Sequence, residues 1–180
     1  MGLVLFVLQA TPVLAETVDD CIQQVNPGRA INACTELLKD KTQTRTQLAA
    51  LYQLRGVAHD NNGKYDKAIA DYSRAIRIKP DDEVHYNRGE AYFKQQQYRS
   101  AIKDFSRAIR FNRKMANAYY NRGTSYFHLR RFRKAIKDFS RTIRLNPNYA
   151  PAYRNRAVAY KSRGKKHKAA ADYRKYMALK

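Results

Sequence analysis

Hydrophobic positions recur along the chain in a pattern that predicts pairs of amphipathic helices. In one stretch, four small or aromatic residues fall at helical spacing: Tyr86, Gly89, Tyr92 and Phe93. The polar run at residues 95–97 then interrupts the pattern. A second helical stripe follows, formed by Tyr98, Ala101, Ile102, Phe105, Ala108 and Ile109. This stretch therefore predicts two helices joined by a short polar turn.

The same pattern repeats along the chain. Residues 67–77 have near copies at 100–110 and 134–144, and a weaker copy at 168–176. The alanines at equivalent places, Ala68, Ala101, Ala135 and Ala169, are 33, 34 and 34 residues apart. A fixed period of this length is typical of stacked helical repeats, in which each unit buries its apolar face against its neighbours.

These residues resemble the tetratricopeptide repeat family, whose repeats are helix–turn–helix units of about 34 residues. The family's series of aromatic, Gly, Tyr, Ala, aromatic and Pro is matched by Tyr119, Gly123, Tyr126, Ala135, Phe139 and Pro147. Departures are His59, Arg113 and Ala157, where Tyr, Pro and Gly are usual, and Thr142 at the second Ala. The resemblance implies an all-α, right-handed α-solenoid of antiparallel helix pairs, with about three and a half to four repeats.

The repeat register predicts the domain organisation. Four repeats are expected, at 49–81, 82–115, 116–149 and, truncated, at 150–180. Residues 16–48 are expected to form a divergent N-terminal hairpin and its connection, with Ala30 standing where Ala68 stands. In that frame Cys21 and Cys34 occupy two columns that touch in the family, which implies a disulfide. Two free core thiols in a cytosolic protein are the alternative.

Residues 1–15 are expected to form a signal peptide. An apolar stretch at 3–8 is followed by small residues before a cleavage site after Ala15, although no basic residue precedes the stretch. The protein is then exported, periplasmic or secreted, and most similar to exported bacterial tetratricopeptide proteins. It is cytoplasmic if this segment is not a signal. No apolar run reaches the length of a stable membrane span.

The formal net charge of +21 lies almost entirely in the second half of the chain. Residues 91–180 contain 25 Lys and Arg against three acidic residues, Asp104, Asp138 and Asp172. A half this basic attracts polyanions over about 10 Å at 0.1 M salt. The candidate contacts are four arginines on second helices, which form the outer face in the family: Arg107, Arg110, Arg141 and Arg144.

No catalytic, metal-binding or cofactor-binding constellation stands out, and the protein is expected to be non-enzymatic. The four histidines show no paired ligand spacing, and the glycines are dispersed rather than gathered in a phosphate loop. One Asp and one Arg recur in each unit, as in Asp138 and Arg122. We expect each Arg to pair with an Asp, within its own unit or across to the preceding one.

Binding is then the expected function. In the family the first helices of successive repeats line a concave groove, and the resemblance assigns it the residues Tyr86, Asn87, Phe93, Tyr120, Asn121, Phe127, Arg154 and Asn155. Thr124, His128 and Val158 lie on the same faces. The three asparagines, one per repeat, form a ladder suited to the backbone of an extended peptide, since an amide both donates and accepts. The alternative is that Asn is simply frequent at that place.

Two functional hypotheses follow. The first is a scaffold or adaptor that binds a protein or extended peptide partner in the groove, in the bacterial cell envelope. The second is a polyanion-binding protein that uses the basic outer face for an anionic envelope polymer or lipid, or for nucleic acid if the protein is not exported. The oligomeric state stays open, because the last repeat has no capping helix and could mediate self-association.

Overall fold

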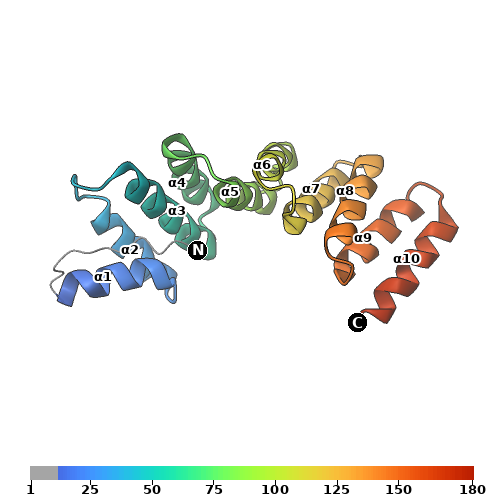
Figure 1. Ribbon diagram of the computed structural model, residues 1–180, viewed down its shortest axis with the longest axis horizontal. Coiled ribbons are helices and arrows are strands. Elements are labelled where there is room, and N and C mark those ends of the chain that lie inside the picture. Colours follow the sequence, from blue (N-terminus) through green and yellow to red (C-terminus); the bar gives the residue numbers. More distant parts are fainter. Residues whose placement is uncertain (1–11) are drawn as a thin grey trace. The chain divides into compact units, whose positions relative to one another are not determined.

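The computed structural model describes residues 12–180, and this range contains ten α-helices (Figure 1). They are α1 (Pro12–Gln23), α2 (Pro27–Leu37), α3 (Arg45–Asn61), α4 (Tyr65–Ile78), α5 (Asp82–Lys94), α6 (Tyr98–Phe111), α7 (Ala116–His128), α8 (Phe132–Leu145), α9 (Ala150–Lys161) and α10 (Lys166–Ala178). Helices adjacent in sequence pack as pairs, which confirms the predicted all-α architecture. Most of the expected signal segment lies outside the described residues, and its last four residues begin α1.

The chain forms two compact units, Met1–Ala91 (unit 1) and Tyr92–Lys180 (unit 2), each described by itself. Helix α5 begins in unit 1 and ends in unit 2. None of the helices that the structure describes is both long and apolar enough to cross a membrane.

Unit 1 opens with the helical hairpin of α1 and α2. The sulfur atoms of Cys21 and Cys34 lie 2.07 Å apart, at disulfide-bond distance, and both residues are fully buried. They pack with Ala33, Leu37 and Leu51, so the hairpin shares its small core with α3. This core places little bulk around two cysteines, which is why a covalent link there contributes more than packing alone.

Helix α3 begins at Arg45, shortly before residue 49, where the first expected repeat opens. Thr44 caps it, because its side chain accepts from the Gln47 backbone while the Gln47 side chain accepts from the Thr44 backbone. This reciprocal capping box satisfies amide groups that the first turn leaves unpaired and so fixes the start of the helix.

Each pair of helices packs closely because a small residue of the first helix faces an aromatic ring of the second. A Cβ atom added at Gly123 of α7 would meet the Phe139 ring of α8 at 2.8 Å. Gly56 and Tyr72 show the same relation in α3 and α4, at 2.7 Å. The glycine therefore permits the close approach that buries the ring.

A partly buried arginine links each of three helix pairs internally. Arg122 of α7 donates from Nε and Nη2 to the two carboxylate oxygens of Asp138 in α8, each at 2.8 Å. Arg55 and Asp71, and Arg156 and Asp172, make the same two-bond pair. Burial lowers the pKa of Arg122, but the bonds and charge of Asp138 outweigh it and raise the pKa. The Asp partner thus lies within the same repeat, which settles the alternative left open by the sequence.

The same arginines reach back to the preceding repeat through a hydroxyl group. The Nη1 atom of Arg122 donates to Ser106 Oγ of α6 at 3.0 Å, and Arg156 donates likewise to Ser140 of α8. The Ser106 hydroxyl donates its hydrogen to the Ile102 carbonyl oxygen, so its oxygen lone pairs are available to accept the hydrogen bond from Arg122. Arg88 and Ser73 repeat the contact at 2.8 Å in unit 1. We call this arrangement of Arg, Asp and hydroxyl the repeat clamp.

Breaking the repeat clamp should destabilise the fold. Asp138→Ala removes a carboxylate that is 5% exposed and leaves the guanidinium of Arg122 without its charge partner. We expect the free energy of unfolding to fall by about 3 kcal/mol. Urea unfolding followed by far-UV circular dichroism measures the change. Lys137→Ala, at an exposed neighbouring position on α8, should change stability by less than about 0.5 kcal/mol.

The double variant Arg122→Leu, Asp138→Ala provides the internal check. Each single substitution leaves one charged group buried, whereas the double substitution removes both charges. The double variant should therefore lose less stability than the sum of the two singles. Additive losses would show that the pair is not a structural unit.

Candidate binding groove

The first helices of the last two repeats frame a pocket in unit 2. It has a volume of about 200 Å³ and lies between α7 and α9, lined by Thr124, Phe127, His128, Arg154, Asn155 and Val158. All six residues come from the helix faces that the sequence assigned to the groove. Apolar walls with a few polar groups are the usual composition of a site for a side chain of a bound partner. We call this pocket the α7–α9 groove.

A hydrogen bond across the two helices orients the key amide of this groove. Asn155 Nδ2 donates to the hydroxyl oxygen of Tyr120 at 2.9 Å. The Tyr120 ring packs against Phe139 and Tyr149, with centroids 5.8 Å and 5.0 Å away. Burial raises the pKa of Tyr120, so its hydroxyl stays protonated at neutral pH. Asn155 keeps one N–H and its carbonyl oxygen for a ligand.

Aromatic rings continue from the groove toward the turns of unit 2. His128 stacks on Tyr98 with centroids 4.5 Å apart and planes 5° apart, and Phe93 meets both rings edge-on. On the other side Phe127 meets Phe132 at 5.3 Å. This stacking favours one orientation of the His128 ring, which forms a wall of the groove.

Comparison with known proteins agrees with this architecture. Models of the TPR repeat match residues 61–96 and 89–129, and a model of the tetratricopeptide repeat matches residues 116–149. The chain is a tetratricopeptide repeat protein. No curated protein sequence matches it.

Solved structures of other tetratricopeptide proteins share the fold. A crystal structure of MamA superimposes with a TM-score of 0.83 at 23% identity, covering 94% of this chain and 95% of that one. The structure of MamA residues 41-end from Desulfovibrio magneticus RS-1 gives a TM-score of 0.84 at 19% identity, with 93% of each chain covered. At this level of identity the likeness concerns the fold alone.

The structure brings together part of the predicted groove of this tetratricopeptide protein. Phe127, Arg154 and Asn155 line one pocket, and Tyr120 joins them by its hydrogen bond. Asn121 lies on α7 one residue further, and Phe93 contacts the wall residue His128. Tyr86 and Asn87 belong to unit 1. The sequence did not predict the Tyr120–Asn155 bond or the Tyr98–His128 stack.

The four outer-face arginines lie on second helices as predicted, but they do not gather into one pocket. Arg107 and Arg110 belong to α6, and Arg141 and Arg144 belong to α8. Arg107 is engaged with Asp104 at 3.4 Å, and Arg141 lies over the Tyr119 ring at 5.7 Å. Two of the four are therefore already held by neighbouring side chains.

The last helix pair leaves an apolar surface exposed. A hollow of about 630 Å³ between α9 and α10 is lined by Ala157, Val158, Lys161, Lys166, Ala169, Ala170 and Tyr173. Val158 is 45% exposed, Tyr173 53% and Met177 54%. If the chain self-associates through its last repeat, these exposed residues would form the contact surface; self-association stays a prediction.

Unit 1 has a polar pocket of about 400 Å³ whose centre is Asp71. Its carboxylate accepts from Arg55 and from Arg74, the latter at 2.7 Å, while His59 Nε2 stays 3.8 Å away. The Nδ1 atom of His59 is buried with no hydrogen-bond partner among the described residues. No group of three or more residues suited to a metal ion occurs in the described range. This pocket therefore has the features of a structural ion cluster.

His59 should make the stability of the protein depend on pH. Burial, assisted by Arg55, Lys67 and Lys64, lowers its pKa below the ordinary 6.5 despite the attraction of Asp71. The unfolded chain therefore takes up a proton that the folded chain resists, and stability falls as pH drops below about 6.5. Urea unfolding at pH 7.5 and pH 5.5 should show this decrease. His59→Gln should reduce it, whereas the same substitution at exposed His167 should not.

Proposed function

We propose that this tetratricopeptide protein is a non-enzymatic scaffold that binds an extended peptide segment of a protein partner in the groove of its first helices. The observation that carries the proposal is the α7–α9 groove, where Asn155 is oriented by Tyr120 beside the apolar walls of Phe127 and Val158. Val158 is 45% exposed, so an apolar surface stands ready in the free protein. A partner side chain that covers it gains apolar burial without rearranging the helices.

The asparagine ladder supplies the polar part of the proposed recognition. Asn121 and Asn155 lie on α7 and α9, one repeat apart, and Asn87 occupies the same place on α5. Amides at a regular spacing can pair with the backbone of a peptide of any sequence. Sequence preference then comes from the aromatic walls and from Glu90, His128 and Arg154, which differ from the residues at the corresponding places of other repeats.

The triple variant Asn87→Ala, Asn121→Ala, Asn155→Ala tests the ladder. A peptide selected from a library against the intact protein is measured by fluorescence anisotropy against both forms. Each lost contact should cost about 1 kcal/mol, so the triple variant should bind about a hundredfold more weakly. A control triple, Asn61→Ala, Asn117→Ala, Asn148→Ala, removes the same amides at exposed positions and should leave affinity unchanged.

A second pair of variants tests the apolar wall. Val158→Gln places a polar group in the α7–α9 groove, and Val25→Gln makes the identical change at a position that is 85% exposed in unit 1. Only the Val158→Gln substitution should weaken binding of the selected peptide. If neither the ladder nor Val158 affects affinity at matched helicity, the groove is not the binding surface.

We further propose that the protein is exported and works in the cell envelope. Support comes from the apolar segment at residues 3–8 with its cleavage pattern, and from the buried cysteine pair at disulfide-bond distance. Disulfides persist in oxidising compartments and are rare in the cytosol.

The mature chain should begin near Glu16 and carry a Cys21–Cys34 disulfide. Intact-mass spectrometry of unreduced native material should then give a mass two hydrogens below that of the reduced chain. Cys21→Ser with Cys34→Ser should lower the free energy of unfolding by about 3 kcal/mol. Recovery of two alkylatable thiols from exported protein would contradict the assignment.

A second candidate function, polyanion binding by the basic exterior, rests on the charge of unit 2. Its three carboxylates are all buried, so the surface of this unit presents cations alone among its charged side chains. Such a surface attracts anionic polymers or lipids in a salt-dependent way. Binding that persists at 0.5 M salt favours the groove, and binding that is lost favours the exterior.

A further inference from the structure

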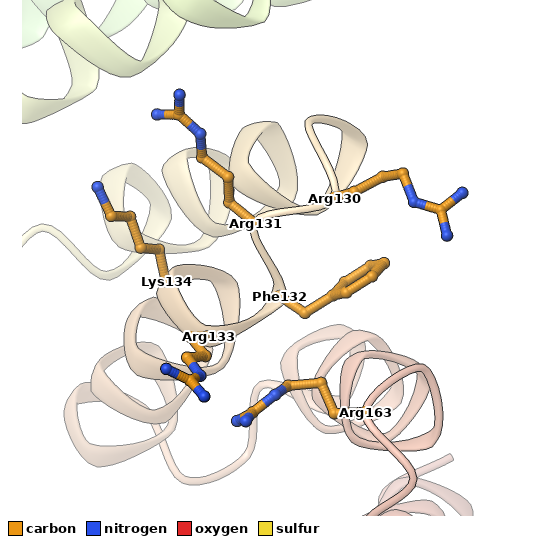
Figure 2. Close-up of a pocket in the computed structure, with 6 residues that line it drawn as sticks. All are labelled: Arg130, Arg131, Phe132, Arg133, Lys134 and Arg163. Atoms are coloured by element: carbon orange, nitrogen blue, oxygen red, sulfur yellow. The ribbon is translucent and has the colours of Figure 1, made fainter.

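Five cationic residues line one pocket at a turn of unit 2. The pocket has a volume of about 310 Å³ and is lined by Arg130, Arg131, Phe132, Arg133, Lys134 and Arg163 (Figure 2). Five of these residues are consecutive: Arg130 and Arg131 lie in the turn after α7, and Phe132, Arg133 and Lys134 begin α8. Arg163 follows α9. Figure 2 shows the side chains of Arg133 and Arg163 directed toward each other, with Arg131 and Lys134 extending together on another side. We call this site the turn pocket.

No carboxylate of unit 2 is left to neutralise the turn pocket. The unit contains three acidic residues, all at most 7% exposed: Asp104, Asp138 and Asp172. Asp138 and Asp172 are used by the repeat clamp, and Asp104 accepts from Arg107. Within the described part of the chain, no ion pair joins any of the five cations to a carboxylate. These exposed cations therefore repel one another, and an anion bound among them lowers this repulsion.

The backbone of the turn pocket also favours a different residue. Arg130 has a φ of 56°, in the left-handed region, and the turns of two other repeats place Gly63 and Gly164 there with a φ of 70°. Glycine takes this conformation without steric cost, whereas an arginine does not. Gln96 takes the same conformation in the turn of a further repeat, with a φ of 60°, so this position also accepts residues other than glycine.

We propose that the turn pocket binds phosphate groups. The planar guanidinium of Arg offers two parallel N–H donors that match two phosphate oxygens, and Arg133 and Arg163 approach the same space from two repeats. A phosphate monoester carries a charge near −2 at neutral pH, so one or two such groups balance the cluster better than a single carboxylate does. Phe132 closes one side of the pocket, with its ring against Phe127 and under Arg130.

This site differs from both surfaces assigned from the sequence. It does not include the four outer-face arginines, and it does not depend on the peptide groove. The phosphate groups can come from a free diphosphate compound or from a phospholipid headgroup, and the chemistry of the contact is the same in both.

Two arginine triples test the site in the full chain. The site variant is Arg131→Gln, Arg133→Gln, Arg163→Gln, and the control is Arg99→Gln, Arg113→Gln, Arg174→Gln. Both remove three exposed positive charges from unit 2, so their net charges are equal. Isothermal titration with pyrophosphate at low salt should show binding to the native chain and a loss of about a hundredfold in the site variant. The control should lose less than about threefold, and far-UV circular dichroism should confirm that both variants fold.

Vesicles separate the two sources of phosphate. Co-sedimentation with vesicles of phosphatidylcholine and phosphatidylglycerol, lost in the site variant alone, assigns the site to lipid headgroups. Loss of pyrophosphate binding alone assigns it to soluble phosphates. Equal losses in both triples would show a diffuse basic field instead of a site, and equally tight binding of succinate would contradict phosphate recognition. Absence of binding to both probes by the native chain would also overturn the proposal.

Discussion

A partly buried guanidinium imposes the strictest requirement in this chain. Arg122 is 19% exposed, and a charge so placed is tolerated only when its donors are satisfied. The repeat clamp satisfies them with two carboxylate oxygens from the same repeat and one hydroxyl from the preceding repeat. One side chain therefore fixes the angle within a helix pair and also the contact between successive pairs. This dual role explains why Arg, Asp and Ser recur together at the repeat period.

The repeat clamp also accounts for the electrostatic character of unit 2. Of its three carboxylates, Asp138 and Asp172 pair with the arginines of the repeat clamp, and Asp104 is buried as well. The surface cations therefore have few internal partners, although the helices themselves are stable through packing and the clamp. Structure and surface charge are thus coupled, because the residues that hold the repeats together are the ones that would otherwise neutralise their exterior.

Much of the fold was predictable because its signals are local or periodic. The spacing of Ala101 and Phe105, or of Gly123 and Phe139, follows from one helix packing on the next, and a repeated sequence displays it several times. The pairing of Arg with Asp was also predictable. Whether the Asp belongs to the same repeat or to the preceding one was not, since both pairings suit the same sequence spacing. The hydroxyl partner was overlooked, although Ser73, Ser106 and Ser140 recur two residues after each Asp and could have revealed it.

The candidate site was predictable only where the family register applies. Faces of α7 and α9 follow from the register, so Phe127 and Asn155 were expected to approach each other. The bond between Asn155 and Tyr120 depends on helix rotations that no spacing fixes. The turn pocket was not predicted at all. Arg163 is about a repeat away from Arg133 in sequence, and the two line one pocket because α8 packs against α9.

In unit 2 the net positive charge and the shape of the two sites have different proposed roles. Its positive field extends over roughly a Debye length, so it speeds the approach of any anionic ligand without selecting one. Selection requires contacts at hydrogen-bond range, and the structure offers two different sets. The α7–α9 groove combines an oriented amide with apolar walls, whereas the turn pocket combines arginine forks with one aromatic ring. Phe127 and Phe132 are in ring contact at 5.3 Å, one lining each site, so the two sites are neighbours with different chemistry.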